Sequence, residues 1–254
     1  EGDLEASKAV YKQVIGNDPK TLSEPKNLSK FIPNNFNDAL TYAKNHNYSV
    51  LAAKEALSAK DYTISANKGT LLPQVSLEGS ANSTRNDLDA AIKDRNQDYY
   101  TVGVNMTVPL YDAGENRAKI RQSKYQKWQA QEEVLSAKRA VRAAVKSAWE
   151  NMKANESQLK SIADQIDASR IALDGVQKEE ALGNRTILDV LDAYQELLNS
   201  EVNDVKARRS YYVSAMNLLA SMGRMTAKSL GLNVELYDAN KYYQETKDKW
   251  ISLD

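Results

Sequence analysis

Residues 115–174 read ENRAKIRQSKYQKWQAQEEVLSAKRAVRAAVKSAWENMKANESQLKSIADQIDASRIALD, 60 positions without a glycine or a proline. Glycine and proline are the strongest helix breakers, so the stretch predicts one helix of about 90 Å at 1.5 Å per residue. A second such run, Asn184 to Met222, predicts another helix of about 58 Å. Because Gly183 stands in a turn-forming sequence between the runs, we predict a long antiparallel helical hairpin over 112–223 with its tip near Gly183.

The apolar residues of these runs form a narrow seam among many alanines and charged residues. They recur at three-, four- and seven-residue spacing: Trp128, Val134 or Leu135, Val141, Val145, Trp149, Met152, Leu159, Ile162, Ile166, Leu173 and Val176. This spacing is typical of coiled-coil packing, and a compact globular bundle would need a wider apolar stripe. Trp128 and Trp149 are three heptads apart, and both are expected to pack in the seam.

A strand pair is predicted upstream of the hairpin. A third run without glycine or proline, Asn34 to Lys68, predicts a helix of about 52 Å within 34–72. The pattern then changes to a period of two, most clearly from Thr101 to Leu110 and more weakly over 75–82, which is typical of strands. The residues between them, 83–98, are polar and charged. The segment 73–111 is therefore expected to be one β-hairpin with a long loop.

The hairpin has two possible environments. A soluble antiparallel pair buries one face against a core, whereas a pair in a membrane turns its apolar face to lipid and its polar face to a lumen. The tyrosines Tyr99, Tyr100 and Tyr111 flank the alternating stretch, at the levels where aromatic residues gather in membrane proteins, and favour the second. Two strands cannot close a barrel, so more chain or more subunits must supply the rest.

Composition argues against most enzyme classes and against nucleic acid as a partner. Lys+Arg and Asp+Glu both number 34, cysteine is absent and His46 is the single histidine. A balanced charge gives no basic surplus for nucleic acid, and the missing thiols and imidazoles remove most metal and acid-base sites. A helical-bundle metalloenzyme would need Glu-x-x-His motifs, but the residue three positions before His46 is Ala43 and not a glutamate. We expect no enzyme activity, cofactor or resident metal, and we interpret His46 as a surface or packing residue.

Several segments resemble the TolC family of outer-membrane channel proteins, over essentially the whole chain. The segment 71–77 (LLPQVSL) is similar to that family's helix-to-strand entry, 108–118 (VPLYDAGENRA) to its strand-to-helix junction and 183–193 (GNRTILDVLDA) to its periplasmic tip. The end of the chain, from Leu218 to Ala227, through Leu230 to Leu232 and on to Trp250, is similar to the branch that serves type I protein secretion.

The resemblance implies a mainly α-helical protein: a trimer whose long coiled-coil helices form a tunnel below a twelve-stranded outer-membrane β-barrel. Each protomer of that family holds two repeats, and this sequence matches the second repeat whole. We therefore expect a part of a longer protomer. It divides into the end of the first repeat's returning helix (1–17), a linker or equatorial segment (18–33), a helix leading to the barrel (34–72), the barrel hairpin (73–111) with an extracellular loop (83–98), the helical hairpin (112–223) and an equatorial segment (224–254).

The tip holds the candidate functional residues. From its sequence alone, Thr186-x-x-Asp189 is interpreted as a capping box, in which Asp189 stabilises a helix start, while Asp192 lies one turn further on. The resemblance implies instead that Asp189 and Asp192 form rings of carboxylates in a trimeric gate, where they could attract cations, and that Arg185 pairs with a neighbouring hairpin. It also implies that Gly183, Asn184, Thr186 and Leu188 belong to a surface where an adaptor docks.

The function that follows from the resemblance is a passive exit duct in the outer membrane of a Gram-negative bacterium, with a long periplasmic extension. It would serve type I protein secretion, multidrug efflux or both. The expected partners are two further copies of the chain, outer-membrane lipid, a periplasmic adaptor protein and an inner-membrane transporter of the ABC, RND or MFS type. The periodicity alone also allows a soluble coiled-coil scaffold without channel activity.

Overall fold

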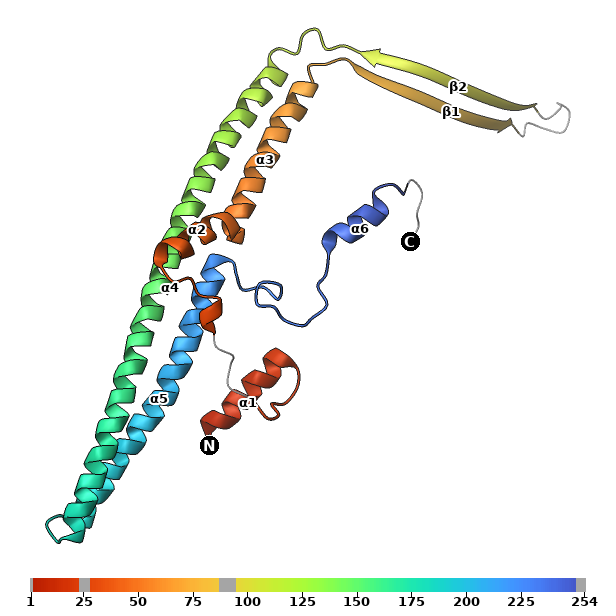
Figure 1. The fold of residues 1–254 in the computed structure, drawn as a ribbon. Coiled ribbons are helices and arrows are strands. Elements are labelled where there is room, and N and C mark those ends of the chain that lie inside the picture. Colours follow the sequence, from red (N-terminus) through yellow and green to blue (C-terminus); the bar gives the residue numbers. More distant parts are fainter. Residues whose placement is uncertain (1, 23–27, 87–94, 250–254) are drawn as a thin grey trace. The chain divides into compact units, whose positions relative to one another are not determined.

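The computed structural model describes residues 2–22, 28–86 and 95–249 (Figure 1). The elements in chain order are α1 (Gly2–Ile15), η1 (Leu28–Lys30), α2 (Phe36–His46), α3 (Tyr48–Gly69), β1 (Gln74–Asn86), β2 (Arg95–Thr107), α4 (Glu115–Ala181), α5 (Ile187–Met222) and α6 (Ala239–Thr246). The prediction of a mainly helical chain with a strand hairpin is confirmed. None of the helices in the described ranges is long and apolar enough to cross a membrane.

The chain divides into two compact units. The described residues of Glu1–Phe36 form one together with Asn151–Leu219, and those of Asn37–Glu150 form the other together with Ala220–Asp254. The first unit therefore holds the tip of the helical hairpin, and the second holds the strands and the start of α4.

The seam of α4 is buried largely as its spacing predicts. Val134, Val141, Val145, Trp149 and Met152 are all buried, and Ile162 and Leu173 continue the line toward the tip. Trp128 is the exception, because 59% of its surface is exposed, and its prediction as a seam residue is wrong. A straight helix drifts about 20° per heptad from a strict seven-residue repeat, so Trp128, three heptads before Trp149, lies about 60° off the seam.

The single helix predicted over 34–72 is broken at Asn47. The backbone there is extended (φ −69°, ψ 127°), and the Asn47 side chain accepts a hydrogen bond from the Ser49 N–H at 2.9 Å, which caps the start of α3. Its Nδ2 also donates to the Ser221 carbonyl at 2.7 Å. A search for glycine and proline misses this break, because asparagine ends one helix and starts the next through its side chain.

The end of α5 packs closely against this α2–α3 junction. Gly223 adopts φ +78°, and a Cβ placed on it would lie 2.5 Å from the His46 carbonyl oxygen. The Arg224 guanidinium lies over the Tyr42 ring, 4.9 Å from its centroid, and Tyr42 stacks on His46 at 4.2 Å. The interpretation of His46 as a surface packing residue is thereby confirmed.

The strand register gives the hairpin two chemically distinct faces. In the antiparallel pair, Val75 lies opposite Met106, Leu77 opposite Val104, and Gly79 and Ala81 opposite Val102 and Tyr100. Since successive residues of a strand point to opposite faces, these apolar residues share one face. The other face carries Gln74, Ser76, Glu78, Ser80 and Asn82 opposite Thr107, Asn105, Gly103, Thr101 and Tyr99.

The strands differ in extent from the prediction. β1 continues to Asn86 and β2 begins at Arg95, so both ends of the predicted loop 83–98 are strand, and its centre, 87–94, lies outside the described residues. Pairing with a partner strand satisfies the backbone of these polar residues, which their composition alone does not indicate. β2 ends at Thr107 rather than at Leu110, and Pro109, which has no N–H to donate to a ladder, follows closely.

Candidate functional site

The tip turn begins with a helix C-cap at the end of α4. Gly183 adopts φ +78°, and its N–H donates to the Glu180 carbonyl at 2.7 Å, while the Asn184 N–H donates to the Glu179 carbonyl at 2.9 Å. These two bonds are those of a Schellman motif, in which glycine supplies the left-handed residue. The motif reverses the chain and brings residue 185 back beside the last turn of α4.

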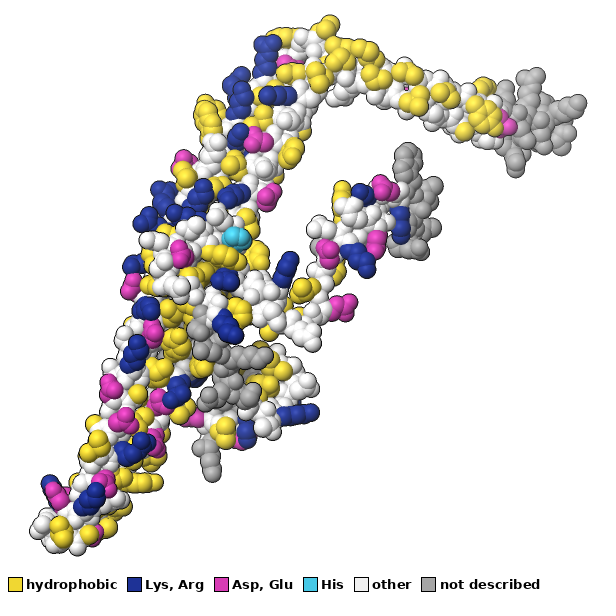
Figure 2. All heavy atoms as spheres, viewed as in Figure 1, with side chains coloured by type: hydrophobic (Ala, Val, Ile, Leu, Met, Phe, Trp, Pro, Cys, Tyr) yellow, Lys and Arg dark blue, Asp and Glu magenta, His cyan; other side chains and the backbone are white. Residues whose placement is uncertain are grey.

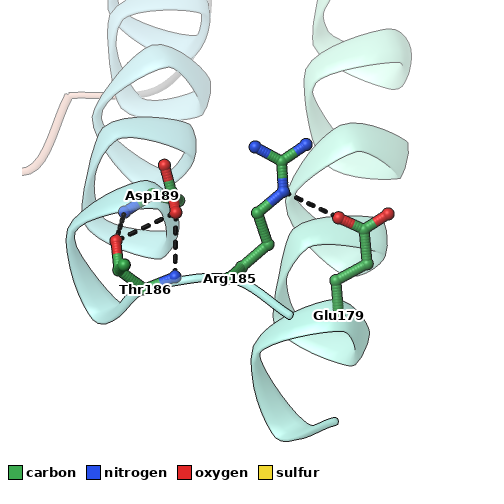
Figure 3. A network of polar contacts seen from close by, with 4 residues as sticks. All are labelled: Glu179, Arg185, Thr186 and Asp189. Atoms are coloured by element: carbon green, nitrogen blue, oxygen red, sulfur yellow. Dashed lines mark hydrogen bonds and ion pairs between the residues drawn. The ribbon is translucent and has the colours of Figure 1, made fainter. Parts of the chain in front are cut away.

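Thr186 and Asp189 form a reciprocal cap at the start of α5. The Asp189 carboxylate accepts from the Thr186 N–H at 2.8 Å and from its hydroxyl at 2.9 Å, and the Thr186 hydroxyl accepts from the Asp189 N–H at 3.3 Å (Figure 3). The bond from the Thr186 N–H is the main cause that lowers the pKa of Asp189. The capping interpretation of Asp189 is confirmed, and its role in a gate stays a prediction.

Arg185 pairs within its own hairpin. Its Nε donates to the Glu179 carboxylate at 2.8 Å (Figure 3), and this bond raises the pKa of the guanidinium. The resemblance implied a partner on a neighbouring hairpin, and sequence reasoning missed Glu179. The C-cap glycine was the available signal, because a Schellman turn at Gly183 folds residue 185 toward residue 179.

Acidic side chains dominate the α5 side of the tip. Asp192 is exposed, and within the described part of the chain it makes no hydrogen bond or ion pair. Residues 187–204 carry five carboxylates and no lysine or arginine: Asp189, Asp192, Glu196, Glu201 and Asp204. This end of the hairpin therefore carries a negative field that would attract cations.

The residues predicted to dock an adaptor, Gly183, Asn184, Thr186 and Leu188, are all exposed at the tip. Leu188 has exposed apolar neighbours that sequence reasoning did not single out: Leu182 (78% exposed), Ile187 (61%) and Leu191 (56%). Large apolar side chains gathered at the end of a hairpin are typical of a protein contact surface.

The predicted interface tyrosines are exposed as well, Tyr99 at 54%, Tyr100 at 80% and Tyr111 at 90%. Tyr99 and Tyr100 lie inside β2 rather than at its start, and Tyr111 follows its end. Across residues 2–22, 28–86 and 95–249, no cluster of three histidine or acidic side chains could hold a metal ion.

Comparison with known proteins identifies the family. The family model described as outer membrane efflux protein matches residues 39–224, from α2 to the end of α5. The chain belongs to the outer membrane efflux protein family. It is 37% identical over 251 residues to the outer membrane efflux protein BepC of Brucella suis, covering 99% of this chain and 54% of BepC. It is 26% identical to the outer membrane protein TolC of Escherichia coli, covering 90% of this chain and 48% of TolC.

The fold is likewise that of a solved channel of this type. The crystal structure of the Campylobacter jejuni CmeC outer membrane channel superposes with a TM-score of 0.67 at 14% identity, over 84% of this chain and 46% of CmeC. The TolC resemblance and the tunnel-type fold are thus confirmed. Membership of the outer membrane efflux protein family makes this an outer-membrane protein whose helices belong to a periplasmic tunnel. The chain spans about half the length of the curated relatives that it matches.

Proposed function

We propose that this chain is part of a homotrimeric outer-membrane channel, a passive exit duct for small-molecule efflux, type I protein secretion or both. The observation that carries the proposal is the two-faced hairpin of β1 and β2. Its apolar face would meet lipid and its polar face a water-filled lumen, as in membrane barrels.

The exposed fractions support this arrangement. Leu77 is 76% exposed, Val102 80% and Val104 73%, although a soluble hairpin would bury one such face. Two strands alone leave their edges unpaired, and each unpaired backbone group costs several kcal/mol in hydrocarbon. With two further strands from the remainder of each protomer, three protomers would close a barrel of twelve.

The hairpin tip is proposed as the gate and the docking point. In a threefold assembly, Asp189 and Asp192 would each form a ring of carboxylates around the entrance, and Arg185 would link neighbouring hairpins when its pair with Glu179 opens. A periplasmic adaptor would contact Gly183, Asn184, Thr186 and Leu188, and an ABC, RND or MFS-type transporter would drive export. No catalytic step is assigned to the chain.

Single-channel recording of the full-length protein tests the gate. Asp192→Ala and Asp189→Ala are each expected to increase conductance or to reduce selectivity for cations, because each removes one ring of charge. Asp164→Ala is the matched control, since Asp164 is an exposed carboxylate on α4 away from the tip.

Thr186→Ala separates the gate from the cap, because it disrupts the helix cap and leaves the rings intact. If Thr186→Ala reproduces the effect of Asp189→Ala while Asp192→Ala changes nothing, both carboxylates lose their role in the gate and Asp189 is a cap alone. If the full-length protein produces no channels in a bilayer, the proposed function itself fails.

A further inference from the structure

Charge along α4 is strongly uneven. Residues 115–146, which follow β2, carry nine lysines and arginines against three acidic residues, whereas 147–181 carry four against seven. Figure 2 shows Lys and Arg gathering over the first half of α4, next to the strands. The overall charge of zero hides this asymmetry, and the proposed channel function gives it no role.

Three cations at the start of α4 lie on one face and lack partners. Arg117, Arg121 and Lys124 follow the i, i+4, i+7 spacing of a single helix face, and all three are exposed. Their neighbours are neutralised, because Lys119 pairs with Glu115 and Lys127 with Asp61, both at 2.6 Å. Within the described residues the three form no ion pair or hydrogen bond.

Arg117 lies in the first turn of α4, which begins at Glu115. The first turn of a helix carries partial positive charge, which favours anions and opposes a cation there. An external anion at this face would relieve the mutual repulsion and the opposition of the helix dipole together. The face therefore has the electrostatic character of an anion-binding surface.

A cavity beside Arg117 combines an apolar wall with this charge. It measures about 300 Å³ and is lined by Leu71, Pro109, Leu110, Tyr111, Asp112, Gly114 and Arg117. Leu110 and Tyr111 are 92% and 90% exposed. The Asp112 carboxylate accepts from the Gly114 and Asn116 N–H groups at 3.0 and 2.9 Å, so backbone donors already hold the one acidic group in the lining.

We propose that Arg117, Arg121 and Lys124 bind the phosphates of anionic phospholipids in the periplasmic leaflet, while Leu110 and Tyr111 lie at the acyl boundary. The inference rests on the proposed function, which places β2 in the membrane and the start of α4 just below it. A cation beside an apolar wall matches the boundary between a phospholipid headgroup and its acyl chains, where basic and aromatic residues gather.

Helix geometry predicts the order of the three contributions. At 1.5 Å per residue, Arg117 lies about 3 Å and Arg121 about 9 Å beyond the start of α4, compared with a headgroup layer of about 5–8 Å. Side chains on a helix lean toward its N-terminus, here toward the membrane, which brings the ammonium group of Lys124 nearer the layer than its backbone. Arg117 should contribute most and Lys124 least.

Native mass spectrometry of the full-length trimer with added phosphatidylglycerol or phosphatidylcholine tests the proposal. The natural protein is expected to retain more phosphatidylglycerol, and each substitution among R117Q, R121Q and K124Q to weaken that preference by up to about five-fold. R117K/R121K should preserve it, because charge is retained. The matched control is R139Q/R142Q, which removes two cations from the same helix several turns further from β2.

The outcomes separate the two proposals. If the unsubstituted trimer conducts in a bilayer but the triple variant R117Q/R121Q/K124Q retains as much phosphatidylglycerol, the lipid assignment is overturned and the channel stands. An equal loss of the phosphatidylglycerol preference in R139Q/R142Q would also overturn it, because the preference would then depend on the total charge of the protein and not on this face. A third outcome would overturn it as well. If R117Q/R121Q/K124Q binds isolated peptidoglycan more weakly than the unsubstituted protein but retains the same amount of phosphatidylglycerol, the face binds the cell wall instead of lipid. If the natural protein forms no channel, the proposed function fails first.

Discussion

Gly223→Ala should destabilise the chain more than the same substitution at any other left-handed glycine in the described ranges. Two costs combine at this position. An alanine at φ +78° costs about 1–2 kcal/mol in backbone strain. The new Cβ would also lie 2.5 Å from the His46 carbonyl oxygen and 3.0 Å from the Asn47 Cα, and both are backbone atoms that cannot rotate away. Overlap of this kind adds about 1–3 kcal/mol.

Gly183→Ala is the matched control. Gly183 adopts the same φ of +78°, but nothing lies within 4 Å of its Cβ position, so only the strain remains. Thermal unfolding of the detergent-solubilised protein, followed by circular dichroism, would compare the variants. At about 2–4 °C per kcal/mol, Gly183→Ala should lower Tm by about 2–8 °C, and Gly223→Ala by about 2–12 °C more.

Equal shifts in the two variants would refute the reasoning, because they would mean that the end of α5 does not press against the α2–α3 junction. Hydrogen exchange adds a check of position. Gly223→Ala should speed amide exchange around Asn47, and Gly183→Ala should speed it only at the tip.

Three further predictions concern single side chains. Thr186→Ala should weaken the start of α5 by about 1 kcal/mol, seen as roughly five-fold faster amide exchange at residues 187–190, and Thr186→Ser should not. Hydrogen bonds from Thr186 lower the pKa of Asp189 from 3.8. The cap should therefore act fully above pH 3.8 and be lost as pH falls through the lowered pKa. Amide exchange at the start of α5, measured against pH, should show this loss, and Asp189→Asn should abolish it. Trp149→Ala should cost about 3–5 kcal/mol in chemical denaturation because Trp149 is 8% exposed, and a comparable loss in Trp128→Ala, at an exposed site, would contradict the assignment of the seam.

Much of the candidate site could be predicted because its determinants are close in sequence. The Gly183 turn and the Thr186–Asp189 cap depend on residues within about one helical turn, and the structure contains both. Glu179 as the partner of Arg185 was missed because the pair depends on the three-dimensional course of the turn. Whether Asp192 faces a lumen depends on the proposed assembly with further copies of the chain, which the sequence of one chain does not describe.

The sequence by itself determined the long helices, their seam and the alternation of β2, since each is a periodic property that local chain geometry converts directly into structure. Only the tertiary structure decided where these helices and strands begin and end. Asn47 breaks a helix by capping it and by bonding to Ser221, 174 residues away. Polar residues extend β1 to Asn86 because a partner strand satisfies their backbone, and the register that unites the apolar residues on one face is a property of the pair. The Asn47 cap is local, but its bond to Ser221 and the strand register depend on contacts between distant segments, which no local pattern encodes.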